Sequence, residues 1–184
     1  MSTTRDGLLA AAATAFERHG YARATIEDVC DLAGVTKGAL YGHFGSKKEL
    51  AIAVLERQAT VWAKQVAQVK GSPLQALVDL GYAVHRDRAR LLFQAPICED
   101  VAERQVSLWR WMVRDLLHAA AAHGELRDEV VVDSCVEGIL AGLVGVHLLS
   151  MSTDGSRGVF GTWRSWLPGI AQPTACANLR WVAP

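Results

Sequence analysis

Hydrophobic residues recur at helical spacing along almost the whole chain. Leu8, Ala12 and Ala15 mark the buried face of a first helix, and Gly20 ends it. No stretch shows the alternation of polar and apolar residues that is typical of a strand. The pattern therefore predicts an all-α protein. Beyond residue 45 it predicts helices over residues 46–70, 73–86, 88–95, 101–123, 129–151 and 156–171.

Signals for helix starts flank a short turn near residue 34. Thr25 and Asp28 form a capping box for a second helix, and Thr36 caps a short third helix that ends near Phe44. Between these helices, Ala33-Gly34-Val35 predicts a tight turn. Ser46 and Glu49 form another capping box, which opens the long helix that follows. Two short helices joined by a turn with glycine are typical of a helix-turn-helix.

This pair of helices has an apolar back and a polar front. The back is formed by Ile26, Val29, Val35, Leu40 and Phe44, and the front carries Thr36, Lys37, Tyr41 and His43. A helix N-terminus aimed at DNA offers free amides and a partial positive charge to phosphate. Residues 25–48 are therefore predicted to dock in the major groove. Periodicity alone also fits three small amphipathic helices in another kind of bundle.

Charge changes this picture only locally. Hydrophobic residues make up 51% of the 184 residues, enough for a core, and the formal net charge is zero. DNA-binding proteins usually carry a basic surplus, so the composition is weak evidence against DNA. No acid occurs between Asp31 and Glu49, however, and Lys37, Lys47 and Lys48 fall in that gap. This basic stretch predicts a few phosphate contacts and a shallow salt dependence.

Composition also limits the other classes of function. Cys30, Cys98, Cys135 and Cys176 lie far apart without a metal-binding spacing, so we expect free thiols and no metal or cofactor. The longest apolar run, Gly138 to Val146, is much shorter than the roughly 20 residues that span a bilayer. With no signal-peptide pattern, the sequence predicts a cytoplasmic protein without a membrane partner. The histidines belong to no catalytic motif, so an enzyme is only a remote alternative.

Specific stretches of the chain resemble the TetR family of transcriptional regulators over residues 7–50. They include Thr25-Ile26-Glu27-Asp28-Val29, Ala33-Gly34-Val35-Thr36-Lys37-Gly38-Ala39-Leu40-Tyr41, His43-Phe44 and Ser46-Lys47-Lys48-Glu49-Leu50. Within the family, Val-Thr-Lys-Gly-Ala-Leu-Tyr is similar to the γ-butyrolactone autoregulator receptors of actinomycetes. Weaker similarity continues through Trp109, Gly124-Glu125-Leu126 and the tract from Gly138 to Leu149.

The resemblance implies roles for individual residues. By it, base or backbone contacts would come from Thr36, Lys37, Gly38 and Tyr41, and phosphate contacts from Thr25, His43 and Lys47. This chain departs from the family at Gly42, where relatives usually carry an aromatic residue. Glycine inside a helix costs about 1 kcal/mol relative to alanine. The contribution of this position to base readout is therefore in question.

The resemblance also implies two domains and a homodimer. Residues 1–48 would form the three-helix DNA-binding domain. Residues 49–172 would form the helical ligand-binding and dimerisation domain, which begins with the connecting helix 49–70. Residues 173–184 would form a tail that packs through Leu179 and Trp181. Two helices offer a dimer surface, through Ile139, Leu140, Leu143, Val144, Val146, Leu148 and Leu149, and through Val159, Trp163, Trp166, Leu167 and Ile170. Gly138, Gly142 and Gly145 would let another helix approach closely. Burial within one monomer is the alternative.

Candidate ligand contacts lie in the predicted C-terminal domain. In the autoregulator receptors a tryptophan of the central helix lines the ligand cavity, and the resemblance favours Trp109 over Trp111. These two side chains point about 200° apart, so only one of them is expected to face a cavity. Tyr82, Gln94 and His147 are candidate polar contacts in an otherwise apolar cavity. Core packing and structural hydrogen bonds are the alternatives.

Together these features predict a DNA-binding repressor that a small-molecule effector releases from a palindromic double-stranded operator. The effector would be a γ-butyrolactone or a related signal. A receptor-like regulator that answers an antibiotic, or no ligand, remains an alternative. The connecting helix would transmit the change, because it touches both domains.

Overall fold

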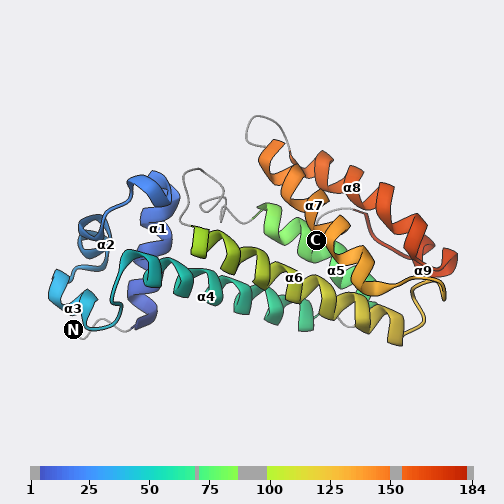
Figure 1. The fold of residues 1–184 in the computed structure, drawn as a ribbon, viewed down its shortest axis with the longest axis horizontal. Coiled ribbons are helices and arrows are strands. Elements are labelled where there is room, and N and C mark those ends of the chain that lie inside the picture. The colour runs from blue at the N-terminus through green and yellow to red at the C-terminus, as the bar shows by residue number, and fades with distance from the viewer. Residues whose placement is uncertain (1–4, 69–70, 87–98, 150–154, 182–184) are drawn as a thin grey trace. The chain divides into compact units, whose positions relative to one another are not determined.

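The computed structural model describes residues 5–68, 71–86, 99–149 and 155–181, and these segments are almost entirely helical (Figure 1). The all-α prediction is confirmed, with no strand among the described residues. The helix predicted over residues 88–95 lies outside them. The helices are α1 (Arg5–Arg23), α2 (Ile26–Ala33), α3 (Lys37–Tyr41), α4 (Lys47–Gln68), α5 (Pro73–Arg86), α6 (Glu99–Ala122), α7 (Val132–Leu149), α8 (Gly155–Ile170) and α9 (Pro173–Ala177).

The helical conformation of α1 is interrupted where the sequence predicted its end. Gly20 has φ 73° and ψ 155°, a conformation that glycine adopts without the steric cost of a Cβ atom. Directly after this break, the ring of Tyr21 lies 5.7 Å from that of Phe16. Both rings are buried, so the residues after the break remain packed against the same core as the rest of α1.

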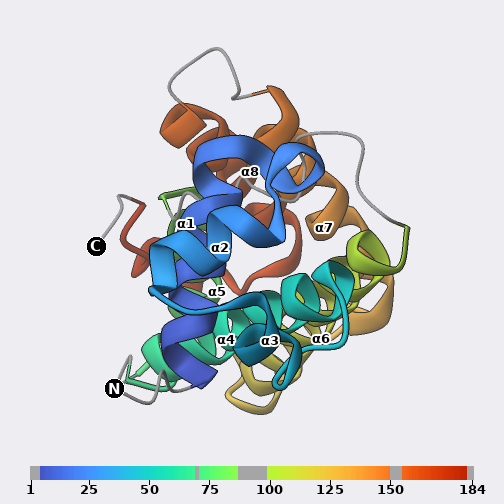
Figure 2. The same ribbon diagram turned by 90° about the vertical axis from the view of Figure 1, so that its left-hand side faces the viewer.

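The predicted capping box starts α2. The Thr25 hydroxyl accepts a hydrogen bond from the Asp28 amide at 3.1 Å, and the Asp28 carboxylate accepts one from the Thr25 amide at 2.7 Å. The helix ends at Gly34, whose φ of 67° is left-handed and favours glycine. Figure 2 shows α2 lying across α1, with α3 following the turn. The predicted helix, turn and helix are thus confirmed as local structure.

The predicted cap of α4 forms with one difference. The Ser46 hydroxyl accepts a hydrogen bond from the Glu49 amide at 3.1 Å, as expected. The Glu49 carboxylate accepts its bond from the Gly45 amide at 2.8 Å, instead of from Ser46 itself. The donor to the Glu49 side chain is therefore one residue earlier in the chain than a capping box predicts, and this hydrogen bond holds the loop before α4.

Two glycines of α7 allow α8 of the same chain to approach closely. A Cβ atom built on Gly138 would lie 2.3 Å from the ring of Trp166, and one built on Gly142 would lie 2.9 Å from Thr162. The indole of Trp163, also on α8, lies against Gly81 of α5, where a Cβ atom would meet it at 2.7 Å. These glycines are therefore used inside one chain to bring α5, α7 and α8 together.

Many of the apolar positions predicted to form a dimer surface on α7 and α8 pack inside one chain. Most of them are buried in a single chain, namely Ile139, Leu140, Leu143, Val159, Trp163, Leu167 and Ile170. Trp166 is 38% exposed, and Val144 and Val146 are partly exposed. Burial within one chain therefore accounts for these residues. The side chains of Leu148 and Leu149 lie outside the described residues, and the dimer surface stays a prediction. A partner would have to use the residues that remain exposed.

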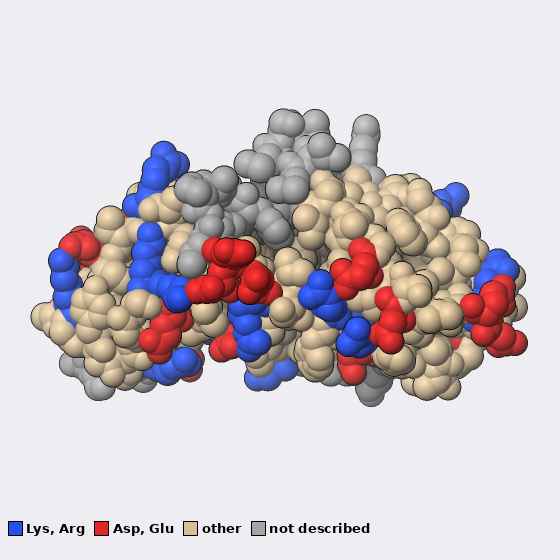
Figure 3. Space-filling model, viewed as in Figure 1, with Lys and Arg blue, Asp and Glu red and all other residues tan. Residues whose placement is uncertain are grey.

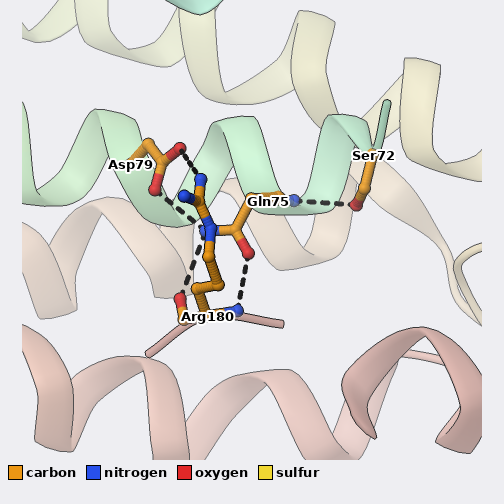
Figure 4. Close-up of polar contacts among 4 residues, drawn as sticks. All are labelled: Ser72, Gln75, Asp79 and Arg180. Carbon is orange, nitrogen blue, oxygen red and sulfur yellow. Dashed lines mark hydrogen bonds and ion pairs between the residues drawn. The ribbon is translucent and has the colours of Figure 1, made fainter. Parts of the chain in front are cut away.

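The segment after α8 packs against α5, as expected for the tail. The Gln75 side chain accepts a hydrogen bond from the Arg180 amide at 2.7 Å and donates one to the Arg180 carbonyl at 3.2 Å (Figure 4). The same amide nitrogen donates to Asp79 at 2.9 Å, and Ser72 accepts a bond from the Gln75 main chain. Leu179 is buried beside them. One side chain thus pairs with the main chain of a residue 105 positions away.

The described residues form two compact units. The first contains α1, α2, α3, α4 up to Thr60 and α6 up to Ser107, and the second contains the remainder. Both α4 and α6 therefore contribute residues to each unit. The predicted boundary between residues 48 and 49 follows the order of the helices and stays a prediction. None of the described helices combines the length and the hydrophobicity of a membrane span.

Candidate nucleic-acid interface

The short helix α3 has one buried anchor and an exposed remainder. Leu40 is fully buried behind it, whereas Tyr41 is 50% exposed. Thr36 precedes the helix, and its hydroxyl accepts a hydrogen bond from the Ala39 amide at 3.3 Å. Because this bond uses the hydroxyl as an acceptor, its proton is available to a phosphate. The following predicted DNA contacts are exposed: Thr25, Thr36, Lys37, Gly38, Tyr41 and His43.

An ion pair holds the first residue of α3. The ammonium of Lys37 bonds to the carboxylate of Glu27 on α2, and both side chains are more than half exposed. The hydrogen bond from Lys37 lowers the pKa of Glu27, and the same bond raises the pKa of Lys37. Lys37 is therefore charged and held in place by Glu27. To bind a phosphate, its ammonium would have to leave the Glu27 carboxylate or bond to both groups.

Thr25 is a helix cap as well as a predicted phosphate contact. Its main-chain amide and its hydroxyl both bond to Asp28, and the main-chain bond is the larger cause of the lowered pKa of that carboxyl group. The Thr25 hydroxyl accepts a hydrogen bond from the Asp28 amide and also bonds to the Asp28 carboxylate. The cap lies at the N-terminus of α2, where anions are favoured.

Lys47 lies closer to the core than the sequence suggested. Its ammonium donates a hydrogen bond to the Ala22 carbonyl at 3.2 Å and lies 4.6 Å from the centre of the Tyr21 ring. Burial lowers the pKa of Lys47. Its neighbour Lys48 forms an ion pair with Asp100 at the start of α6. Both lysines therefore also stabilise the unit, and neither is a freely moving charge.

Gly42 ends α3 without any backbone need for glycine. Its φ is −66° and its ψ is −19°, values that every residue adopts in a helix. A Cβ atom built there would lie 3.4 Å from the Ala39 carbonyl oxygen, an ordinary contact distance. The position is exposed. The departure from the family at Gly42 therefore removes a surface side chain and meets no packing requirement.

Acidic and basic side chains are interspersed on the face drawn in Figure 3. Several of them form ion pairs within the chain, such as Arg104 with Glu56. This distribution matches the zero formal net charge.

The two candidate tryptophans of α6 point in opposite directions, as predicted. Trp109 is 5% exposed and Trp111 is 58% exposed. The Tyr82 hydroxyl donates a hydrogen bond to the Trp181 carbonyl at 2.5 Å, so its polar atom has a structural partner. Gln94 and the side chain of His147 lie outside the described residues. Of the two candidate tryptophans, Trp109 is therefore buried and Trp111 is exposed.

Sequence reasoning missed a buried polar residue on α6. Gln105 is 1% exposed, and neither atom of its side-chain amide has a hydrogen-bond partner among the described residues. An unpaired buried amide is costly, which makes it a candidate contact for a bound molecule. The signal was present in the sequence, because Gln105 stands between the apolar residues Val101 and Trp109 at four-residue spacing.

Comparison with known proteins identifies the class of this interface. Residues 8–54 match the family "Bacterial regulatory proteins, tetR family". The chain is 34% identical over 190 residues to the A-factor receptor protein of Streptomyces griseus, covering 96% of this chain and 67% of that protein. It is 31% identical over 149 residues to the HTH-type transcriptional repressor KstR2 of Mycolicibacterium smegmatis, covering 72% of each.

A solved structure agrees with these relatives. A γ-butyrolactone receptor described as ArpA-like matches with a TM-score of 0.66 and 28% identity, covering 97% of this chain and 92% of the other. The matched fold extends through the C-terminal helices, beyond the 8–54 stretch that carries α2 and α3. The chain therefore belongs to the TetR family of bacterial regulatory proteins, whose members are DNA-binding transcription factors and not enzymes.

Proposed function

We propose that this protein is a repressor that binds a palindromic operator as a homodimer and releases it when a small molecule binds the C-terminal helices. TetR regulators bind operator DNA and small-molecule effectors. The observation that carries the DNA half of the proposal is the surface of α3. Leu40 fixes this helix from behind, while Lys37 and Tyr41 remain exposed in front. Such a protein works in the cytoplasm, where bacterial DNA lies.

The specific contacts follow from the surface. Lys37 and Tyr41 project from α3 to bases or phosphates, with Thr36 and Gly38 at the helix start. Thr25, His43 and Lys47 hold phosphates on either side. The N-terminus of α2, which Thr25 caps, suits a phosphate oxygen. Such contacts position the protein, and the exposed side chains of α3 read the sequence.

A dimer supplies the second half-site. A single helix-turn-helix reads few base pairs, and dimers bind two half-sites about one helical turn, or a multiple, apart. The apolar surface left for a partner includes Phe160 and Trp166, which are 39% and 38% exposed. Gly145 has no heavy atom near a built Cβ position, so a second helix has room to approach it.

The effector class follows from the relatives' names and from one buried side chain. One relative is named a receptor for A-factor, and a structural neighbour is named a γ-butyrolactone receptor. Trp109 is the buried aromatic residue that such a ligand would contact. An apolar ligand with one lactone carbonyl needs few polar contacts. A regulator that answers an antibiotic, or none, is the alternative.

Selection of duplexes from a random pool by the full-length protein tests the DNA half. We expect a palindromic sequence to be enriched. Tyr41→Ala should then weaken binding to it by about 1–3 kcal/mol, because a base-specific contact is lost. Val131→Ala, an exposed substitution far from α3 in the sequence, is the control. Unchanged operator affinity in folded Tyr41→Ala would remove Tyr41 from the interface.

Adding ligands to the selected complex tests the effector half. A γ-butyrolactone is expected to release the DNA, and Trp109→Leu should reduce that release without changing operator affinity in the absence of ligand. Release by an antibiotic alone would favour the alternative. A lactone that binds but leaves operator affinity unchanged would contradict the coupling, because an effector acts only through its differential affinity for two states.

A further inference from the structure

An open groove of about 250 Å³ lies on the second unit, apart from α3. The C-terminal part of α4, the start of α5 and the second half of α6 line it. Its apolar surface comes from residues such as Val66, Pro73, Leu80 and Met112. Ligand pockets for drug-sized molecules have volumes of roughly 300–1,000 Å³. This groove therefore has room for a small molecule of about one ring with a short substituent.

Trp111 forms one side of the groove and is unusually exposed. Its indole is 58% exposed, while Met112 next to it in the chain is 4% exposed. Ligand pockets are lined mainly by hydrophobic and aromatic side chains with a few polar groups, and Trp111 adds an aromatic side chain to the apolar lining of this groove. The face of an indole also carries negative electrostatic potential and attracts cations.

The carboxylate of Asp115 is the charged group that lines the groove. It lies one helical turn after Trp111, so the two side chains share a face of α6. The arginines nearest to it on this helix are engaged elsewhere, Arg110 with Glu137 and Arg114 with Asp133. Asp115 itself forms no ion pair with another described residue.

We infer that this groove binds a small organic cation with an apolar body, such as a quaternary or tertiary ammonium compound. The ammonium lies between the Asp115 carboxylate and the Trp111 indole face, and the apolar body covers Met112 and Leu80. A neutral lactone would use the apolar floor but gain nothing from the Asp115 charge. The groove lies apart from the proposed DNA contacts, which belong to the first unit.

Calorimetric titration of the full-length protein without DNA tests the inference. The probes are benzyltrimethylammonium, neutral 2-phenylethanol and anionic phenylacetate, which share an aromatic ring. We expect the cation to bind most tightly. Asp115→Asn, which keeps the shape of the side chain, should raise the dissociation constant of the cation about three- to tenfold and leave that of phenylethanol unchanged. Asp128→Asn, an exposed aspartate outside the groove, is the matched control.

Trp111→Leu separates the aromatic contribution from simple burial. It keeps an apolar side chain and removes the ring, so the cation should lose about three- to tenfold in affinity. Equal binding of all three probes, or the same effect of Asp115→Asn and Asp128→Asn, would overturn the inference. Because operator binding is not measured, neither result depends on the proposed repressor function.

Discussion

Lys37 and Glu27, ten residues apart, form an ion pair that joins the start of α3 to α2. We propose the same Lys37 ammonium as a DNA contact, so Glu27 competes with DNA for it. Glu27→Gln should therefore tighten DNA binding about two- to fivefold, because an exposed ion pair is a weak competitor. Fluorescence anisotropy with labelled operator at fixed salt measures this change.

A charge control accompanies Glu27→Gln. Asp31→Asn removes one negative charge from the same helix, and Asp31 is also exposed. It should change the affinity less than Glu27→Gln does. If the two variants tighten binding equally, the effect is one of overall charge, and the pair with Lys37 does not restrain DNA binding.

Two glycines of the DNA-binding unit should respond oppositely to alanine. Gly42 has helical φ and room for a Cβ atom, so Gly42→Ala should stabilise the protein by about 0.4–1 kcal/mol through the unfolded state. Gly34 has φ 67°, and Gly34→Ala should cost about 1–2 kcal/mol although no atom obstructs the side chain. Urea unfolding measures both. Destabilisation by Gly42→Ala would mean that glycine is needed there after all.

The local structure around α2 and α3 was predictable because its signals are close in sequence. The Thr25 box and the Gly34 turn each involve residues within a few positions of one another. The Lys37 ion pair was not predicted, because it depends on how the turn orients two helices. The opposite directions of Trp109 and Trp111 followed from helical geometry alone.

The C-terminal helices were harder to interpret, for a physical reason. Periodicity shows that a face of α8 is buried, but it cannot show whether the same chain or a partner covers it. Trp163 and Leu167 lie in the core of one chain. The unpaired amide of Gln105 depends on which atoms surround it, and the bonds of Gln75 reach a segment 105 residues away. For both Gln105 and Gln75, no nearby residue in the sequence indicates what surrounds the side chain.

The contacts of Gln75 predict a measurable contribution to stability. Gln75→Leu keeps most of the volume but removes both bonds to the Arg180 main chain and the bond to Asp79 (Figure 4). We expect the free energy of unfolding to fall by about 1–3 kcal/mol, because buried polar partners lose their bonds. Gln65→Leu, on an exposed position of α4, is the control and should change it little. Equal effects would show that the C-terminal segment contributes no stability through Gln75.

The cap of α2 predicts a response to acid. The pKa of Asp28 lies below its ordinary value of 3.8, because the Thr25 amide and hydroxyl bond to its carboxylate. A group with a lowered folded pKa contributes stability above its unfolded value and loses it as the pH falls through the folded value. Asp28→Asn should therefore flatten the fall in unfolding free energy below about pH 3.8. An unchanged slope in folded Asp28→Asn would contradict this role for the cap.

Gly145 offers a test of the proposed dimer that leaves the single chain intact. Among the described residues, no heavy atom lies within 4 Å of a Cβ atom built there, so Gly145→Glu should fold while adding a charge to α7. If a second copy covers this surface, sedimentation velocity should show the mass of a monomer, and operator affinity should fall at least about tenfold because one half-site contact is lost. Val131→Glu adds the same charge at a position that is 65% exposed and should remain dimeric. Gly138→Ala is a different control, because its Cβ atom would collide with Trp166 and destabilise the fold itself. A folded Gly145→Glu protein that stays dimeric would exclude this part of α7 from the interface.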